Sequence, residues 1–569
     1  SSLSLARACV AQTFWARRPI FFSRLKRCPS LACRGFSFFA SCEPTTMQHV
    51  RRLANKTSLT QQRAKAAAAA AAPAKSSGKS LPVPTFTEVK FQKEDVGAVM
   101  AELPAYDFYE MKEPEVNPYA GTTLDRSILL SPPTPAPPKR SIEFAKLENG
   151  LKIASIEKGG LKASVGLLVS AGSRFESTAN FGVSHMVSLM GYKSTAHLSH
   201  LRTVKTIEQL GSAFSTSATA GREEMAYQVD VMREYVPLVV PLLIGNVLFP
   251  RLLPWEVKSA HAKVKEARAA LEGNPDAMVS ELLHKAAFCN NTLGLSPLAS
   301  ERSMSYFTPE TIRSFLLDHF APERMVLVGV NVAPGELSKW AMRSFADYNA
   351  IPLKKREESK AMYTGGSLLI DGPSPFCHLA LGLQSMPWGS AELAPMAILQ
   401  AILGAGTAVP SALGGGSLSR LSTQVVRQNP YVESCSAFNT TYSDSGLFGV
   451  YGVSHPDKGG ELCAAMAKAL SGLTSITKDE LTAAKMVLKG KMLRQTDDSA
   501  TMMRDIGQQL LLSGSYASPA EFSKIIEAVT LDEVTAAAKK LLASKPTVAG
   551  YGDTHAVPHV GAVEAMLKA

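Results

Sequence analysis

An internal repeat is the sequence feature that most constrains how this chain folds. Residues 212–217 (Ser-Ala-Phe-Ser-Thr-Ser) recur as residues 436–441 (Ser-Ala-Phe-Asn-Thr-Thr), an offset of 224 positions. The same offset relates six further identical pairs, which are Tyr227 and Tyr451, Val229 and Val453, Glu256 and Glu480, Ala260 and Ala484, Lys265 and Lys489, and Met278 and Met502. One offset held over about seventy residues indicates two tandem domains of similar fold.

Each copy opens with strand-like segments and continues with helical ones. Asn149-Gly150 separates two apolar segments, and this dipeptide favours a β-hairpin. Strands are predicted at 142–145, 151–155, 164–170, 367–370 and 378–383, and helices at 181–189, 256–271, 393–403 and 478–493. Strands grouped before helices predict an α+β fold, in which each domain is an antiparallel sheet backed by helices.

The net charge of +11 is concentrated at the start of the chain. Residues 1–80 carry fourteen Lys or Arg and one acid, Glu43, which leaves −2 for the remaining 489 residues. A segment rich in Arg, Ser and Ala and almost free of acids is typical of a mitochondrial transit peptide. Met47 offers an alternative start and a shorter presequence. Because the basic residues belong to this leader, the charge does not predict a nucleic-acid-binding face.

The organisation of the chain follows from these shifts in composition. The predicted parts are a targeting leader (1–75), a Pro-rich extension (76–140), a first domain (141–350), a charged linker (351–366) and a second domain (367–569). The extension ends in a run rich in proline, residues 131–138, and we expect it to lie over another surface.

No transmembrane helix is predicted, because the longest apolar stretch, 235–249, is too short and contains two prolines. The eight cysteines show no C-x-x-C spacing and predict neither a disulfide framework nor a cysteine zinc site.

Residues 181–193 contain part of a zinc-peptidase motif. An H-x-x-E-H helix places two imidazoles on one face to bind zinc, and its glutamate takes the proton from the metal-bound water. Here His185 occupies the first ligand position, whereas Ser188 replaces the general base and Leu189 replaces the second ligand. One imidazole cannot hold catalytic zinc, and serine without a partner base cannot replace glutamate. We therefore predict the frame of a peptidase with no catalytic residue, no metal and no cofactor.

Four segments resemble the M16 (pitrilysin-type) metallopeptidase family, and specifically its mitochondrial branch. They are residues 171–176, 181–195, 221–227 and, most specifically, 436–449, and the resemblance extends over about residues 141–560. That branch contains the subunits of the mitochondrial processing peptidase and the core proteins of the cytochrome bc1 complex. The resemblance implies two α+β domains that face each other like a clam shell around a cavity. In the catalytic beta subunits of that branch, a downstream glutamate completes the zinc site. Glu256 and Glu266 lie on the helix where that ligand would be sought, and we assign neither as a zinc ligand.

Two functions follow from the resemblance, and the sequence does not decide between them. One is a structural, non-catalytic core subunit of complex III on the matrix side of the mitochondrial inner membrane. The other is the non-catalytic alpha subunit of the processing peptidase, which binds presequence peptides, and one chain could do both. The implied partners are a core protein 1 or beta-type subunit, cytochrome b, cytochrome c1 and the Rieske protein. An independent zinc peptidase is disfavoured by Ser188 and Leu189 together.

A glycine-rich segment is the remaining candidate for contact with a substrate. Its glycines are Gly404, Gly406, Gly414, Gly415 and Gly416. Glycine permits unusual backbone angles and close approach, so this segment is either a substrate-contacting loop or a passive connector. No Gly-Lys-[Ser/Thr] follows, so it is not a phosphate-binding loop.

Acidic residues and a histidine pair complete the set of candidates. A presequence is cationic, so acids on a cavity wall would orient it, and the candidates are Glu176, Glu223, Glu224 and Asp230. The alternative for each acid is ordinary surface solvation. His197 and His200 form an H-x-x-H pair, but without a third ligand they indicate a solvated loop or helix.

Overall fold

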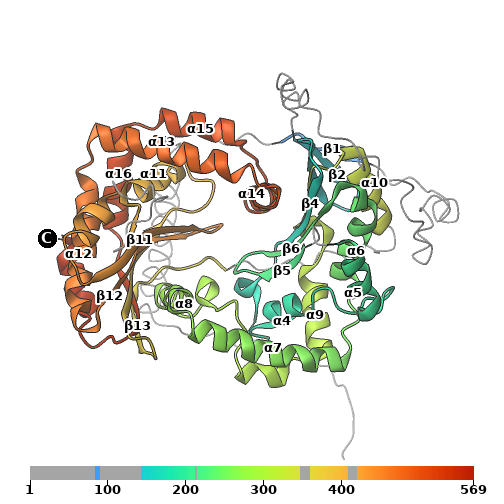
Figure 1. Cartoon of the computed structure of the whole chain (residues 1–569), viewed down its shortest axis with the longest axis horizontal. Coiled ribbons are helices and arrows are strands. Elements are labelled where there is room, and N and C mark those ends of the chain that lie inside the picture. The colour runs from blue at the N-terminus through green and yellow to red at the C-terminus, as the bar shows by residue number, and fades with distance from the viewer. Residues whose placement is uncertain are drawn as a thin grey trace, which may run out of the picture. The chain divides into compact units, whose positions relative to one another are not determined.

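The computed structural model describes residues 84–89, 142–177, 180–211, 215–345, 359–407 and 419–568. The predicted leader, most of the Pro-rich extension, part of the charged linker and Gly414, Gly415 and Gly416 lie outside these residues. Two mixed β-sheets with helices packed on them form the described part of the chain (Figure 1).

The first sheet has seven strands in the order β1-β2-β3-β7-β4-β6-β5. The strands are β1 Thr87–Val89, β2 Glu143–Leu147, β3 Lys152–Ile156, β4 Lys162–Val169, β5 Ser215–Ala220, β6 Met225–Met232 and β7 Met325–Val330. The predicted hairpin joins β2 and β3, and Gly150 takes a φ of +91° in its turn. Asn149 Oδ1 accepts a hydrogen bond from the Leu151 N–H, which stabilises that turn.

The second sheet has six strands in the order β10-β11-β12-β9-β13-β8. They are β8 Gly366–Asp371, β9 Cys377–Ser385, β10 Ala405–Thr407, β11 Val432–Thr441, β12 Gly446–Ser454 and β13 Thr547–Gly552. The α+β class with two tandem domains is confirmed by these two sheets and their helices.

The predicted antiparallel pairing holds for most neighbouring strands, but each sheet is mixed and also contains parallel pairs. β7 runs parallel to β3, and β13 runs parallel to β8. Each of these strands returns to its sheet after a long helical excursion and inserts between strands that come early in its domain. A strand that returns by such a crossover can pair in parallel, and no short hairpin constrains its direction.

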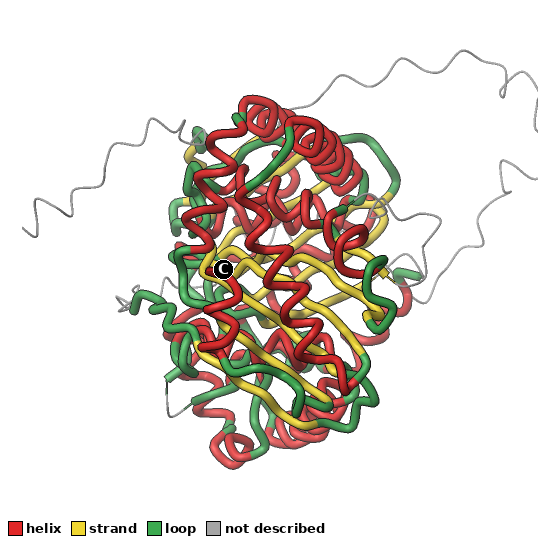
Figure 2. Tube along the Cα trace, turned by 90° about the vertical axis from the view of Figure 1, so that its left-hand side faces the viewer, coloured by secondary structure: helices red, strands yellow, loops and turns green. Residues whose placement is uncertain are grey.

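The helices confirm the repeat. Those of the first domain are α4 Val183–Leu189, α5 His200–Gln209, α6 Val236–Leu248, α7 Pro254–Glu272, α8 Pro275–Ala287, α9 Pro309–His319 and α10 Pro334–Phe345. Those of the second are α11 Leu393–Leu403, α12 Gly459–Ser471, α13 Lys478–Gln495, α14 Ser499–Leu512, α15 Pro519–Ala528, α16 Leu531–Leu542 and α17 Val560–Lys568. Both α7 and α13, and both α8 and α14, begin 224 residues apart. Figure 2 shows helices of the second domain lying over the strands of its sheet.

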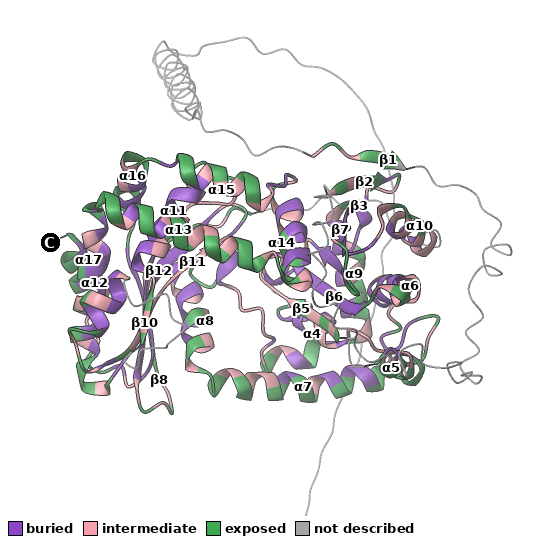
Figure 3. Ribbon diagram, turned by 45° about the horizontal axis from the view of Figure 1, so that its top comes forward, coloured by how far each residue is buried: buried purple, intermediate pink, exposed green. Residues whose placement is uncertain are grey.

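Each domain also contributes one helix to the other domain's sheet. α14 packs on β4 and β7 of the first sheet, and α8 packs on β8, β9 and β13 of the second. Met503 and Ile506 of α14 are buried against Leu168 and Val328 of the first sheet. Figure 3 shows buried residues on α14 where it meets these strands. The two domains are therefore joined by two apolar interfaces that exchange equivalent helices, since burial of apolar surface is the main stabilising term.

Part of the N-terminal extension lies on the first sheet, as an added edge strand. β1 pairs in parallel with β2. The Phe86 ring meets the Phe144 ring edge-on at a centroid distance of 5.7 Å, and Phe144 in turn contacts Tyr516 at 6.1 Å. Edge strands carry unpaired backbone groups, and covering one with a short strand limits pairing with other chains. Within the described ranges, no helix is long and apolar enough to cross a membrane.

Candidate functional site

The helix with the degenerate peptidase motif is α4, and its histidine is a packed core residue. His185 is only 8% exposed. Its Nδ1 accepts a hydrogen bond from the Ala299 N–H at 3.4 Å. Burial lowers the pKa of His185 to about 4, so the ring is neutral at physiological pH. His185 therefore stabilises the packing of α4 against a neighbouring loop.

The other two motif positions are also engaged in local structure. Ser188 Oγ donates a hydrogen bond to the His185 carbonyl oxygen at 2.8 Å. Leu189 packs against the apolar core of the first domain. In the part of the chain that the structure describes, no group of three His, Cys, Asp or Glu residues is arranged to hold a metal ion.

The two acids considered as a third ligand differ in their surroundings. Glu256 is 7% exposed, and its Oε1 accepts hydrogen bonds from Ser194 Oγ at 2.6 Å and from the Ser194 N–H at 3.3 Å. Glu266 is exposed on α7. Glu256 therefore holds the loop that follows α4. The two histidines of the H-x-x-H pair also lie in different surroundings. His197 is exposed on a loop beside Phe249, and His200 begins α5.

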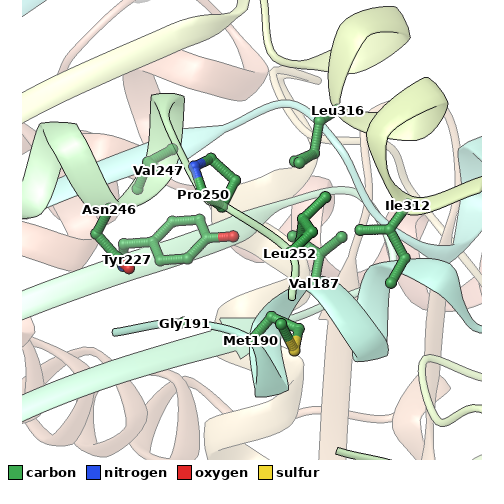
Figure 4. Close-up of a pocket in the computed structure, with 10 residues that line it drawn as sticks. All are labelled: Val187, Met190, Gly191, Tyr227, Asn246, Val247, Pro250, Leu252, Ile312 and Leu316. Atoms are coloured by element: carbon green, nitrogen blue, oxygen red, sulfur yellow. The ribbon is translucent and has the colours of Figure 1, made fainter. Parts of the chain in front are cut away.

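Beneath α4 the core leaves only a very small gap, shown in Figure 4. Its volume is about 10 Å³, and apolar side chains including Val187, Met190, Ile312 and Leu316 surround it. A space of this size holds one water molecule at most. The gap therefore belongs to the core and offers no room for a substrate.

Glu176 caps the N-terminal end of α4. Its carboxylate accepts hydrogen bonds from the Gly182 N–H at 2.7 Å, the Ser184 N–H at 2.9 Å and Ser184 Oγ at 2.5 Å. The side chain is buried, and burial raises the pKa of Glu176 to about 7 although these bonds favour the ionised form.

We expect Glu176→Gln to change how the stability of the protein depends on pH. In the unfolded chain this carboxyl ionises near its ordinary pKa of about 4.5, whereas in the folded chain it keeps its proton to about 7. The folded state binds more protons between these values, so wild-type stability falls as pH rises through this window. Glutamine does not titrate, so the variant lacks this pH dependence. Its free energy of unfolding, measured by urea unfolding at pH 5, 6, 7 and 8, should vary less with pH than that of the wild type. Glu208→Gln, at an exposed position of α5, is the matched control. Parallel profiles for wild type and Glu176→Gln would contradict the assignment.

The three remaining segments that carry the family resemblance meet at a buried ionic network. Arg174 pairs with Asp444 through two hydrogen bonds, Nη1 to Oδ1 at 2.9 Å and Nη2 to Oδ2 at 2.5 Å. The same guanidinium forms an ion pair with Glu223, and both of these side chains are 6% exposed. Ser443 donates to Glu223 from its N–H at 2.9 Å and from its Oγ at 2.7 Å. The network therefore links residues of the first domain to the β11–β12 turn of the second.

Neighbouring contacts extend this junction along α8. His284 Nε2 and the Tyr442 hydroxyl lie 2.8 Å apart, and Arg222 pairs with Glu281 at 2.8 Å. Asp444 also accepts a hydrogen bond from the N–H of Ala361, within the predicted linker, at 2.8 Å. These contacts thus hold the two domains together.

The structure gives each of the four candidate acids a partner within the chain, and contact of these acids with a presequence stays a prediction. Glu176 accepts hydrogen bonds at the start of α4, and Glu223 pairs with Arg174. Glu224 accepts a hydrogen bond from Gln508 of α14, and Asp230 pairs with Lys162 at 3.3 Å. Glu176, Glu223 and Asp230 are each less than 10% exposed, so surface solvation was wrong for these three. Composition alone cannot distinguish a buried structural carboxylate from one that faces a ligand.

Two of the five candidate glycines are described, and packing explains both. Gly404 has a φ of +64°, and an added Cβ would lie 2.4 Å from Ser419 Cβ. At Gly406 an added Cβ would lie 2.7 Å from Ser422 Cα. These glycines therefore allow β10 to approach the short helical segment Leu421–Val426 closely. Contact with a substrate by the rest of the loop stays a prediction.

Comparison with known proteins agrees with this picture of a peptidase frame. Residues 152–301 match the family described as insulinase (peptidase family M16), and residues 306–488 match the peptidase M16 inactive domain. The chain is 32% identical over 460 residues to the mitochondrial-processing peptidase subunit alpha of Solanum tuberosum, which covers 79% of this chain and 90% of that protein. It is 31% identical over 431 residues to the mitochondrial cytochrome b-c1 complex subunit 2 of Homo sapiens, which covers 75% of this chain and 93% of that protein. The chain belongs to the M16 peptidase family.

A solved structure shares the fold. A chain of complex III2 from Candida albicans, Inz-5 bound, superposes with a TM-score of 0.66 at 19% identity, covering 75% of this chain and all of that one. The match to the inactive M16 domain and the two kinds of relative support a chain that is not itself an enzyme.

Proposed function

We propose that this chain is a non-catalytic core subunit, similar to core protein 2, of the mitochondrial cytochrome bc1 complex. In that role it supports assembly and stability of the ubiquinol–cytochrome c reductase from the matrix side of the inner membrane. The observation that carries the proposal is the state of the motif helix. His185 is neutral and packed, Ser188 bonds its own helix, and Leu189 lies against the core.

The partners in this proposal are those of a respiratory complex. A core protein 1 or beta-type chain would pair with this one, and cytochrome b, cytochrome c1 and the Rieske protein would complete the assembly. The human relative supports this reading, because its name is that of a cytochrome b-c1 complex subunit and it matches over most of both chains.

The alternative proposal is the presequence-binding alpha subunit of the processing peptidase. The potato relative bears that name and matches this chain at a similar identity. The glycine-rich segment that begins at Gly404 would then contact presequences, and a catalytic beta-type partner would cleave them. The two roles are compatible if one complex carries both.

A native separation of mitochondrial complexes tests these roles. Mitochondria are solubilised gently, the complexes are resolved, and the band that contains this chain is assayed for presequence cleavage. We expect the chain to migrate with cytochrome b and cytochrome c1. Zinc-dependent cleavage in that band would add the alpha role to the core role. Activity in a small soluble heterodimer, with none of the chain in complex III, would overturn the core proposal.

A further inference from the structure

A hollow of about 260 Å³ lies between helices α11, α13, α14 and α15 of the second domain. None of the residues identified in the sequence as candidate site residues lines it. Its size suits one long side chain of a ligand rather than a whole small protein segment.

The hollow contains a carboxylate that has no cationic partner among the described residues. Asp505 lines the hollow and is accessible to solvent within it. Its Oδ2 accepts a hydrogen bond from Gln509 Nε2 at 3.0 Å. Among the described residues Asp505 forms no ion pair, and partial desolvation by the helices around it raises the pKa of its carboxyl. A positively charged group placed here would stabilise the ionised form of the Asp505 carboxyl.

The walls beside this carboxylate are apolar and adaptable. Met492 and Met502 line the hollow, together with the rings of Trp388 and Phe522. Methionine is unbranched and polarisable, so it fits ligands of different shape. An aliphatic stem can lie along such walls while its charged end reaches the carboxylate, as Lys and Arg side chains do on protein surfaces.

The hollow borders the junction between the two domains. Arg504 and Gln508 line it and also contact the first domain. Arg504 Nη2 donates a hydrogen bond to Thr219 Oγ1 at 3.0 Å, and Gln508 donates to Glu224. Among the described residues that line the hollow, Arg504 is the one basic residue, and it is held toward the first domain. Domain junctions are common places for ligand sites.

We propose that this hollow binds one Arg or Lys side chain of a basic amphipathic peptide, with its stem against Met492 and Met502 and its cationic end at Asp505. The inference rests on the presequence-binding role and names a site for it. The partner class is a peptide with several cations and no acids, which is the composition of a targeting leader.

The test uses a peptide with the sequence of residues 47–63 of this chain, which contains Arg51, Arg52, Lys56 and Arg63 and no acid. A second peptide has these four cations replaced by Gln. Binding of each labelled peptide is measured by fluorescence anisotropy to the complex isolated with a tagged wild-type or variant full chain, at low ionic strength. Asp505→Asn should weaken binding of the basic peptide by about five- to tenfold and leave the Gln peptide unchanged. Asp532→Asn, at an exposed position of α16, is the matched control and should change neither.

The possible outcomes separate this inference from the function on which it rests. If the wild-type complex binds the basic peptide and Asp505→Asn binds it equally well, the hollow is not the site. Equal weakening for both peptides would also overturn the inference, because the loss would not depend on peptide charge. If the wild-type complex does not prefer the basic peptide at all, the presequence-binding role fails, and this inference fails with it.

Discussion

Replacing Arg174 with methionine is expected to lower the free energy of unfolding by about 3–5 kcal/mol. The guanidinium is almost fully buried and bonds two carboxylates, those of Glu223 and Asp444. Methionine fills much of the same volume but leaves both acids without a cation in a region that water reaches poorly. Removing one partner of a buried ion pair costs much more than the pair itself contributes, because the remaining charge is uncompensated.

Urea unfolding of the full chain measures this loss, and Arg233→Met is the matched control. Arg233 pairs with Glu157 at 2.6 Å, but its side chain is 40% exposed. Pairs at such positions contribute about 0–1 kcal/mol, so the control should lose far less than Arg174→Met. Adding Glu223→Gln to Arg174→Met should recover part of the loss if the uncompensated carboxylate is its cause. Similar losses for the two single variants would show that the network is not important for stability.

The strands and helices that local sequence signals predicted are present in the structure, although the structure contains many more. Asn149-Gly150 predicted a hairpin that the structure contains, because a turn of this kind depends on neighbouring residues alone. The helix expected at 393–403 matches α11, and the one expected at 478–493 lies within α13. The repeat predicted two domains of similar fold, and the helix pairs α7–α13 and α8–α14 confirm it.

What the sequence could not predict depends on contacts between distant residues. Arg174 and Asp444 are 270 residues apart, and nothing near either residue indicates the other. The parallel pairing of β7 with β3 also depends on where a strand inserts after a long excursion. At the candidate site, the replacements Ser188 and Leu189 were visible in the sequence, whereas the contact of His185 with Ala299 was not. Asp505 carried no sequence signal, because only the packing of four helices creates the hollow around it.

The exchange of helices between the domains leads to the second large prediction. Ile506 of α14 and Leu282 of α8 occupy equivalent positions, 224 residues apart. They are 1% and 2% exposed, and each belongs to the apolar cluster that joins its helix to the sheet of the other domain. We expect Ile506→Ala and Leu282→Ala each to lower the free energy of unfolding by about 2–5 kcal/mol, through lost burial and the cavity left behind.

Urea unfolding of the full chain again provides the measurement. Leu493→Ala is the control, because Leu493 is 57% exposed on α13. This substitution should change the free energy of unfolding by less than about 0.5 kcal/mol. The double variant then tests how the two interfaces act. Ile506 and Leu282 contact different sheets, so independent interfaces would give losses that add. If instead each interface can form only while the other is intact, one substitution already weakens both interfaces. The double variant should then lose less free energy of unfolding than the sum of the two single losses. A loss in either single variant as small as that of Leu493→Ala would mean that the exchanged helices do not hold the domains together.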